Sequence, residues 1–195
     1  KNEPPKPVVQ EYAPGDLNLF RARKVESLVV QSKIINFPET ELSNPPDSLA
    51  AEGRMNPKGI SYFYGAKDRD TCVAELRPSI SEMVISTEFE LIDKVRLLDL
   101  TMLSKGLHKS AGSIFDDGYS EMLVNRQLLR RLHWLIAQPV LDGEEFDYLP
   151  TQAMAEYLAR RIEPRVDGII FGSVQKAGGE NVVLFPHVLR DENHS

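Results

Sequence analysis

The stretch Gly53-Arg-Met-Asn-Pro-Lys-Gly-Ile-Ser-Tyr-Phe-Tyr-Gly-Ala-Lys-Asp68 joins a turn-rich loop to an apolar, aromatic run. Two glycines and a proline shape the loop, and the run at 60–66 has the composition of a buried strand. Asp68 is placed to cap a helix, which Pro78 must end. The stretch therefore predicts a loop, a strand and a short helix in immediate succession.

Charged and aromatic side chains in this region have the composition of a binding site. Arg54 and Lys58 lie in the loop, and Tyr64 lies in the predicted strand. Glu75 lies in the predicted helix at the boundary of its apolar stripe, about 100° from the centre of that stripe in helical geometry. Cations, aromatic rings and one carboxylate suit a phosphate-bearing ligand. A solvated loop with ordinary charges has the same composition, so the residues alone leave both interpretations open.

The overall composition is that of a single globular domain. The 195 residues are 42% hydrophobic, and the net charge of −6 argues against a general nucleic-acid or anionic-membrane surface. No apolar run approaches the length of a membrane span. Cys72 is the only cysteine, which excludes an internal disulfide and suits the reducing cytoplasm. The four histidines lack ligand-pair spacing, so we expect no metal site.

The order of the predicted elements favours an α+β fold. Strand patterns occur at 17–23, 60–66, 83–92, 95–100, 167–173 and 181–185, and helical patterns at about 69–76, 113–138 and from 149 onward. Because most strands do not alternate with helices, a doubly wound parallel sheet is disfavoured. The segments 83–92 and 95–100 are expected to be neighbours across a turn.

The chain is expected to divide into two parts. Residues 1–16 are proline-rich and predict a poorly packed arm or linker. Residues 17–195 predict the domain itself, with a helical insertion at about 104–147, and 38–52 predict a loop with at most one helical turn. The dinucleotide motif GxGxxG and the esterase motif GxSxG are absent, and Gly178-Gly179 lacks the Gly-Lys-Ser/Thr ending of a P-loop.

Several short motifs, taken in order, resemble the RES domain, a family named for its Arg, Glu and Ser. The matching pieces are Phe20-Arg21, Gly53 to Gly59, Tyr64-Gly65-Ala66, Ala74-Glu75, Tyr148 to Gln152, Asp167 to Ser173 and Asn181 to Phe185. Met55 stands where an aromatic residue is frequent, and Val174 stands where a second serine is common. The resemblance extends from about residue 17 to 186.

The resemblance implies a mixed or antiparallel sheet core with flanking helices, similar to that of ADP-ribosyltransferases. It also implies NAD as the substrate, because RES toxins of toxin–antitoxin pairs cleave NAD with phosphate or water as acceptor. No prosthetic group is expected, and inorganic phosphate would be a co-substrate. The alternatives are transfer of ADP-ribose to a protein and a non-catalytic interaction module.

The resemblance also assigns roles to individual residues. The expected catalytic residues are Glu75, Arg54 and Ser173, and the expected residues for NAD or phosphate are Arg21, Tyr64, Asn56, Lys58, Gln152 and Asn181. Glu75 would stabilise positive charge on the ribose, and the arginines would bind phosphate. Tyr64 as a core residue, Asn181 as a turn cap and Lys58 as a solvated lysine remain open.

An activity that depletes NAD must be restrained. We therefore expect an inhibitory antitoxin, or an N-terminal regulatory domain absent from this chain, as partner. Nucleic acid and membrane are not expected as partners, the expected location is the cytoplasm, and assembly into a homo-oligomer stays open.

Overall fold

The computed structural model describes residues 8–102, 127, 131, 134–136, 148–161 and 163–189. Its strands are β1 (Val9–Tyr12), β2 (Asn18–Val25), β3 (Phe63–Ala66), β4 (Met83–Glu90), β5 (Val95–Asp99), β6 (Gly168–Gly172) and β7 (Glu180–Leu184). Its α-helices are α1 (Leu28–Asn36), α2 (Pro38–Glu41), α3 (Arg69–Glu75) and α6 (Leu149–Arg161), and short 3-10 helices occupy Asp47–Leu49 and Pro186–Val188.

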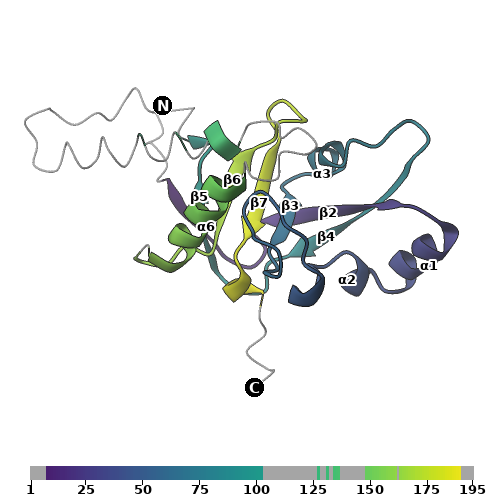
Figure 1. Ribbon diagram of the computed structural model, residues 1–195, viewed down its shortest axis with the longest axis horizontal. Helices are drawn as coiled ribbons and strands as arrows, with labels where there is room; N and C mark the ends of the chain where they lie inside the picture. Colours follow the sequence, from purple (N-terminus) through teal and green to yellow (C-terminus); the bar gives the residue numbers. More distant parts are fainter. Residues whose placement is uncertain are drawn as a thin grey trace, which may run out of the picture.

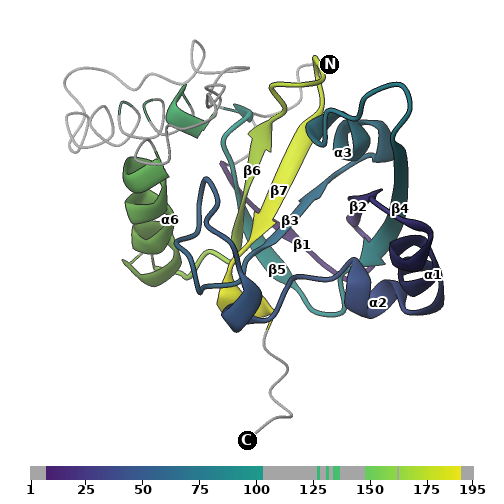
Figure 2. The ribbon, with the colours of Figure 1, turned by 45° about the vertical axis from the view of Figure 1, so that its right-hand side comes forward.

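The strands form one mixed sheet in the order β1-β5-β6-β7-β3-β2-β4 (Figure 1). β5 and β6 are parallel, and the other pairs are antiparallel. The predicted α+β fold with a mixed sheet is therefore confirmed. In the view of Figure 2, α6 lies to the left of the sheet, and α1 and α2 lie to the right, near β2 and β4.

Alternating side chains of the central strands bury both faces of the sheet. On β6, Ile169 and Phe171 pack with Leu158 of α6, whereas Ile170 packs with Leu184 in a second core on the other face. This is the two-residue period of a strand covered on both sides. In the described part of the chain, the sheet therefore has one apolar core on each face.

The first strand corrects one expectation. Residues 9–12 were expected to belong to a poorly packed arm, but β1 pairs along its length with β5, from Val9↔Leu98 to Tyr12↔Val95. Val9 packs against one core and Tyr12 against the other. The prolines at 7 and 14 flank this segment without entering it, so it is free to pair.

A second expectation was wrong about strand pairing. β4 and β5 are not neighbours, because β4 pairs with β2 at one edge of the sheet and β5 lies between β1 and β6. Leu97 and Leu98 of β5 are both buried, although they point to opposite faces. A strand buried on both faces belongs in the interior of a sheet, whereas the partly exposed β4 tolerates an edge.

The other helical segments of the structure differ in part from those predicted. Helix α1 was not predicted; it begins after Ser27, whose side chain accepts a hydrogen bond from the Val30 amide. Residues 38–52 were predicted as a loop with at most one helical turn, but the segment contains two, α2 and the 3-10 helix at Asp47–Leu49. Pro38 suits the first turn of α2, because a proline lacks the amide hydrogen that is unpaired at that position. The predicted insertion at about 104–147 lies almost entirely outside the described residues.

Candidate functional site

A cleft with a volume of about 310 Å³ opens beside β2, β3 and α3. β2 pairs with β3 through Phe20 and Ala66, and then follows β4 along its whole length. Five of the expected site residues line the cleft: Arg21, Arg54, Tyr64, Glu75 and Asn181. Its volume is at the lower end of the range for small-molecule sites, roughly 300–1,000 Å³.

Glu75 is the last residue of α3, and two distant residues hold its carboxylate. The predicted cap is confirmed, because Asp68 accepts a 2.9 Å hydrogen bond from the Thr71 amide. The Ser173 hydroxyl donates to Oε1 of Glu75 at 2.6 Å, and the Asn181 amide donates to the same oxygen at 2.7 Å. The Glu75 side chain is otherwise exposed to solvent. The structure thus brings Glu75, Ser173 and Asn181 together in one hydrogen-bonded cluster.

The loop after β6 fixes the orientation of Ser173. Its hydroxyl oxygen accepts hydrogen bonds from the backbone amides of Gln175 and Lys176, at 3.1 and 3.0 Å. Lys176 in turn forms a 2.7 Å ion pair with Asp68 at the start of α3. A Cβ added to Gly179 would lie 2.4 Å from the Thr71 hydroxyl oxygen, so this close approach requires glycine. The loop and α3 are therefore held against each other.

Two arginines, Arg54 and Arg21, line the same cleft as the Glu75 carboxylate. Arg54 is half-buried, and its side chain donates a hydrogen bond to the Ile136 carbonyl. Burial is the main cause that lowers the pKa of Arg54, and the nearby Glu75 charge opposes that shift.

Arg21 has fewer partners than Arg54. Its guanidinium carbon lies 5.4 Å from the centroid of the Phe63 ring, and burial lowers the pKa of the group. Its buried Nη1 has no hydrogen-bond partner within the described part of the chain. An orphaned buried donor is costly, and a bound anion would satisfy it.

Tyr64 both lines the cleft and braces the loop that carries Arg54. Its hydroxyl donates to Oδ1 of Asn56 at 2.7 Å and accepts from the Met55 amide at 3.0 Å. Burial strongly raises the pKa of Tyr64, so the phenol keeps its proton. Tyr64 also packs against the core that α6 covers.

Three expected binding residues lie outside the residues that line the cleft. Asn56 is buried, and its side-chain amide donates to the carbonyls of Ala51 and Ile60 at 2.9 and 3.0 Å. Gln152 is also buried, and it donates to the Gly53 carbonyl at 3.0 Å. Both side chains shape the arginine-bearing loop, whereas Lys58 is exposed on that loop. Direct ligand contacts by these three residues stay a prediction.

Among the polar residues that line the cleft, Arg77 and Gln175 were not expected site residues. The sequence feature that could have identified Arg77 is its position as a basic residue between the expected catalytic Glu75 and Pro78. Cys72 also lines the cleft, and burial raises the pKa of its thiol to about 11, which disfavours a nucleophilic thiolate at neutral pH.

The fold and cleft define an α+β domain with a fixed carboxylate opposite several arginines. The RES domain family model matches residues 20–194, and the chain belongs to that family. This membership is consistent with an enzyme and with a toxin-like role in NAD chemistry. A search of curated proteins gives no match. Among the described helices, none has the length and apolar character needed to cross a membrane.

Proposed function

We propose that this chain degrades NAD by cleaving the bond between nicotinamide and ribose. The observation that carries the proposal is the Glu75 carboxylate, which Ser173 and Asn181 fix through one oxygen in a cleft that Arg54 and Arg21 also line. The two hydrogen bonds are made before any ligand arrives, so the carboxylate is preorganised.

The chemistry needs one carboxylate and no general acid at the leaving group. When the bond from the ribose carbon to the nicotinamide nitrogen breaks, its electron pair neutralises the positive pyridinium ring. Positive charge then develops on the ribose, as in glycoside cleavage, and a nearby carboxylate stabilises it. An oxygen of phosphate or water forms the new bond to the ribose carbon. Glu75 is suited to stabilising that charge and to orienting a ribose hydroxyl.

The two arginines supply the affinity for the phosphates of NAD or for a phosphate acceptor. Guanidinium groups bind phosphate oxygens through paired, charge-assisted hydrogen bonds. The Nη1 of Arg21 supports this assignment, because it is a buried donor for which the described residues provide no acceptor. Asn56 and Gln152 would act indirectly, by holding the loop that carries Arg54.

The biological setting follows from the chemistry. We propose a cytoplasmic toxin or defence effector, which a protein antitoxin or a regulatory domain outside this chain restrains. NAD is a shared metabolite, so an unrestrained enzyme of this kind would arrest its own cell.

The test is to incubate the purified chain with NAD, with and without phosphate, and to identify the products by mass. Nicotinamide release with ADP-ribose indicates hydrolysis, and a phosphorylated ADP-ribose indicates phosphorolysis. Label from NAD on a macromolecule would instead identify ADP-ribosyl transfer to protein. A folded chain that releases no nicotinamide under any of these conditions would refute the proposal.

A further inference from the structure

Arg77 occupies a strained backbone position at the end of α3. Its φ of 45° places it in the left-handed region, and its amide donates to the Ala74 carbonyl at 3.0 Å. Glycine usually occupies this position after a helix, because a side chain there is unfavourable. Pro78 restricts the same backbone further. The presence of an arginine at a position that favours glycine suggests that the arginine side chain has a function.

The segment after α3 contacts β2 at two residues, Arg77 and Glu82. Lys24 of β2 forms a 2.9 Å ion pair with Glu82 and lies 3.5 Å from the Arg77 carbonyl oxygen. Glu82 also accepts a hydrogen bond from the Ser79 amide at 2.8 Å. These contacts hold the backbone of Arg77 at the edge of the cleft.

Arg77 lines the cleft together with Arg54 and Arg21. Arg77 is exposed, whereas the other two arginines are half-buried, so it lies nearer the solvent. Burial is the first cause of the lowered pKa of Arg54, and repulsion from Arg77 lowers that pKa further. Three guanidinium groups thus share a cleft with one carboxylate, Glu75, in a chain whose net charge is −6.

This excess of positive charge calls for a ligand with more than one negative charge. We propose that Arg77 binds the outer phosphate of a pyrophosphate-containing ligand whose inner phosphate lies against Arg54 and Arg21. The ligand class is then a dinucleotide or nucleoside diphosphate, in preference to a mononucleotide. The inference rests on the proposed function for the identity of the ligand as NAD, but the pyrophosphate subsite follows from the three arginines.

A purely structural explanation of Arg77 makes a different prediction. A cation just beyond a helix C-terminus interacts favourably with the helix dipole, and the last turn of α3 contains no basic residue. If that were its role, removing the side chain would lower stability and leave ligand affinity unchanged. Substitution by glycine separates the two explanations, because glycine also relieves the backbone strain.

The experiment measures binding by calorimetry in a Glu75→Gln background, in which turnover is expected to be about 10³-fold slower. We expect Arg77→Gly to weaken NAD binding about tenfold, equivalent to about 1.4 kcal/mol. The same substitution should change the affinity for nicotinamide mononucleotide less than twofold, and the Tm should stay equal or rise. Arg77→Lys should restore part of the affinity for NAD. Arg160→Ala, an exposed arginine on α6, is the matched control.

Inorganic pyrophosphate and inorganic phosphate serve as additional probes, so that the two proposals fail separately. If the wild-type chain releases no nicotinamide but Arg77→Gly still weakens pyrophosphate binding selectively, the subsite stands and NAD cleavage does not. If NAD is cleaved but Arg77→Gly binds pyrophosphate and NAD as tightly as its parent, the subsite is refuted. An equal loss for one-phosphate and two-phosphate ligands also refutes it.

Discussion

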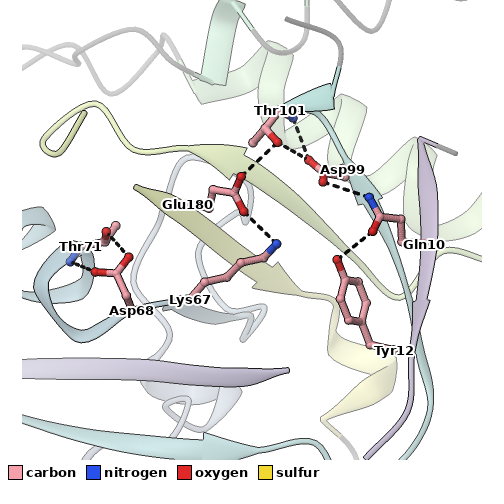
Figure 3. Close-up of polar contacts among 8 residues, drawn as sticks. All are labelled: Gln10, Tyr12, Lys67, Asp68, Thr71, Asp99, Thr101 and Glu180. Atoms are coloured by element: carbon pink, nitrogen blue, oxygen red, sulfur yellow. Dashed lines mark hydrogen bonds and ion pairs between the residues drawn. The ribbon is translucent and has the colours of Figure 1, made fainter. Parts of the chain in front are cut away.

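Consecutive residues of β7 face two polar regions that differ in how their charges are paired. Glu180 forms a 2.8 Å ion pair with Lys67, whereas Asn181 points to the opposite face and bonds Glu75 in the cleft. Figure 3 shows the first region, in which Asp99 accepts hydrogen bonds from Thr101 and Gln10. Each side chain of that network has a hydrogen-bond or ion-pair partner within it, whereas the cleft has more guanidinium groups than carboxylates. The comparison teaches that an excess of positive charge, rather than polarity as such, distinguishes the candidate site.

Size is a poorer guide than charge. A larger cavity, of about 680 Å³, lies beside the core that contains Phe63 and Leu184. Its ionisable side chains include His187, which pairs with Asp167 at 2.9 Å, and Lys94, which pairs with Glu11. The other ionisable side chains that line it, Glu90 and Asp93, are carboxylates, and its described lining contains no arginine, so the larger cavity lacks the cationic character of the cleft.

The largest expected effect comes from removing the charge at the centre of the cleft. Glu75→Gln keeps an oxygen that can accept from Ser173 and Asn181 but loses the negative charge. Nicotinamide release should fall by about 10³-fold, since electrostatic stabilisation of a transition state contributes roughly 10²–10³ per group. Initial rates at saturating NAD measure the effect, and Glu156→Gln on the exposed face of α6 is the control. A wild-type rate of nicotinamide release in Glu75→Gln would contradict the proposed functional difference between the cleft and the paired network.

The paired network should respond in stability instead of activity. Asp99→Ala leaves the Thr101 amide and the Gln10 side chain without their acceptor. We expect the free energy of unfolding to fall by about 2 kcal/mol and the Tm by roughly 4–8 °C. Activity per folded molecule should stay within a factor of three. Denaturant unfolding and rate measurements test both statements, with the exposed Asp93→Ala as control; a selective loss of activity would contradict them.

Ser173→Ala should have an intermediate effect on catalysis. It removes one of the two hydrogen bonds to Glu75 and the acceptor for the Gln175 amide. We expect kcat to fall about tenfold, equivalent to about 1.4 kcal/mol, with little change in KM, because Asn181 still holds the carboxylate. Ser173→Thr, which keeps the hydroxyl, should recover part of the loss, and Ser81→Ala should have no effect. A large rise in KM alone would instead indicate a role in binding.

The smallest effect concerns the ion pair between Lys176 and Asp68. The hydrogen bond from Lys176 is the main cause that lowers the pKa of Asp68 to about 2, and Thr71 contributes. A depressed carboxyl pKa stabilises the fold above the unfolded value, about 3.9, and this stabilisation is lost as the pH falls to about 2. Asp68→Asn keeps the helix cap but removes the charge. Its Tm should be below that of the wild type at pH 7 and converge with it near pH 2; a constant difference across this range would contradict the assignment.

The sequence by itself determined the local elements around the cleft. The glycines and Pro57 shape the loop, Asp68 caps α3 and Pro78 follows its end, since turn, cap and ring constraints act over a few residues. The ordered motifs also predicted the family and the α+β class, and both are confirmed. Residues that are close in sequence therefore carried much of the information about this wall of the cleft.

Only the tertiary structure decided how distant segments meet. Ser173 and Asn181 lie 98 and 106 residues beyond Glu75 and reach the same carboxylate oxygen because β6 and β7 pair beside β3. The incorporation of β1, the separation of β4 from β5 and the inward orientation of Asn56 also depend on which faces become buried. Burial is a property of the assembled sheet, and no local pattern of side chains specifies the partner that will cover it.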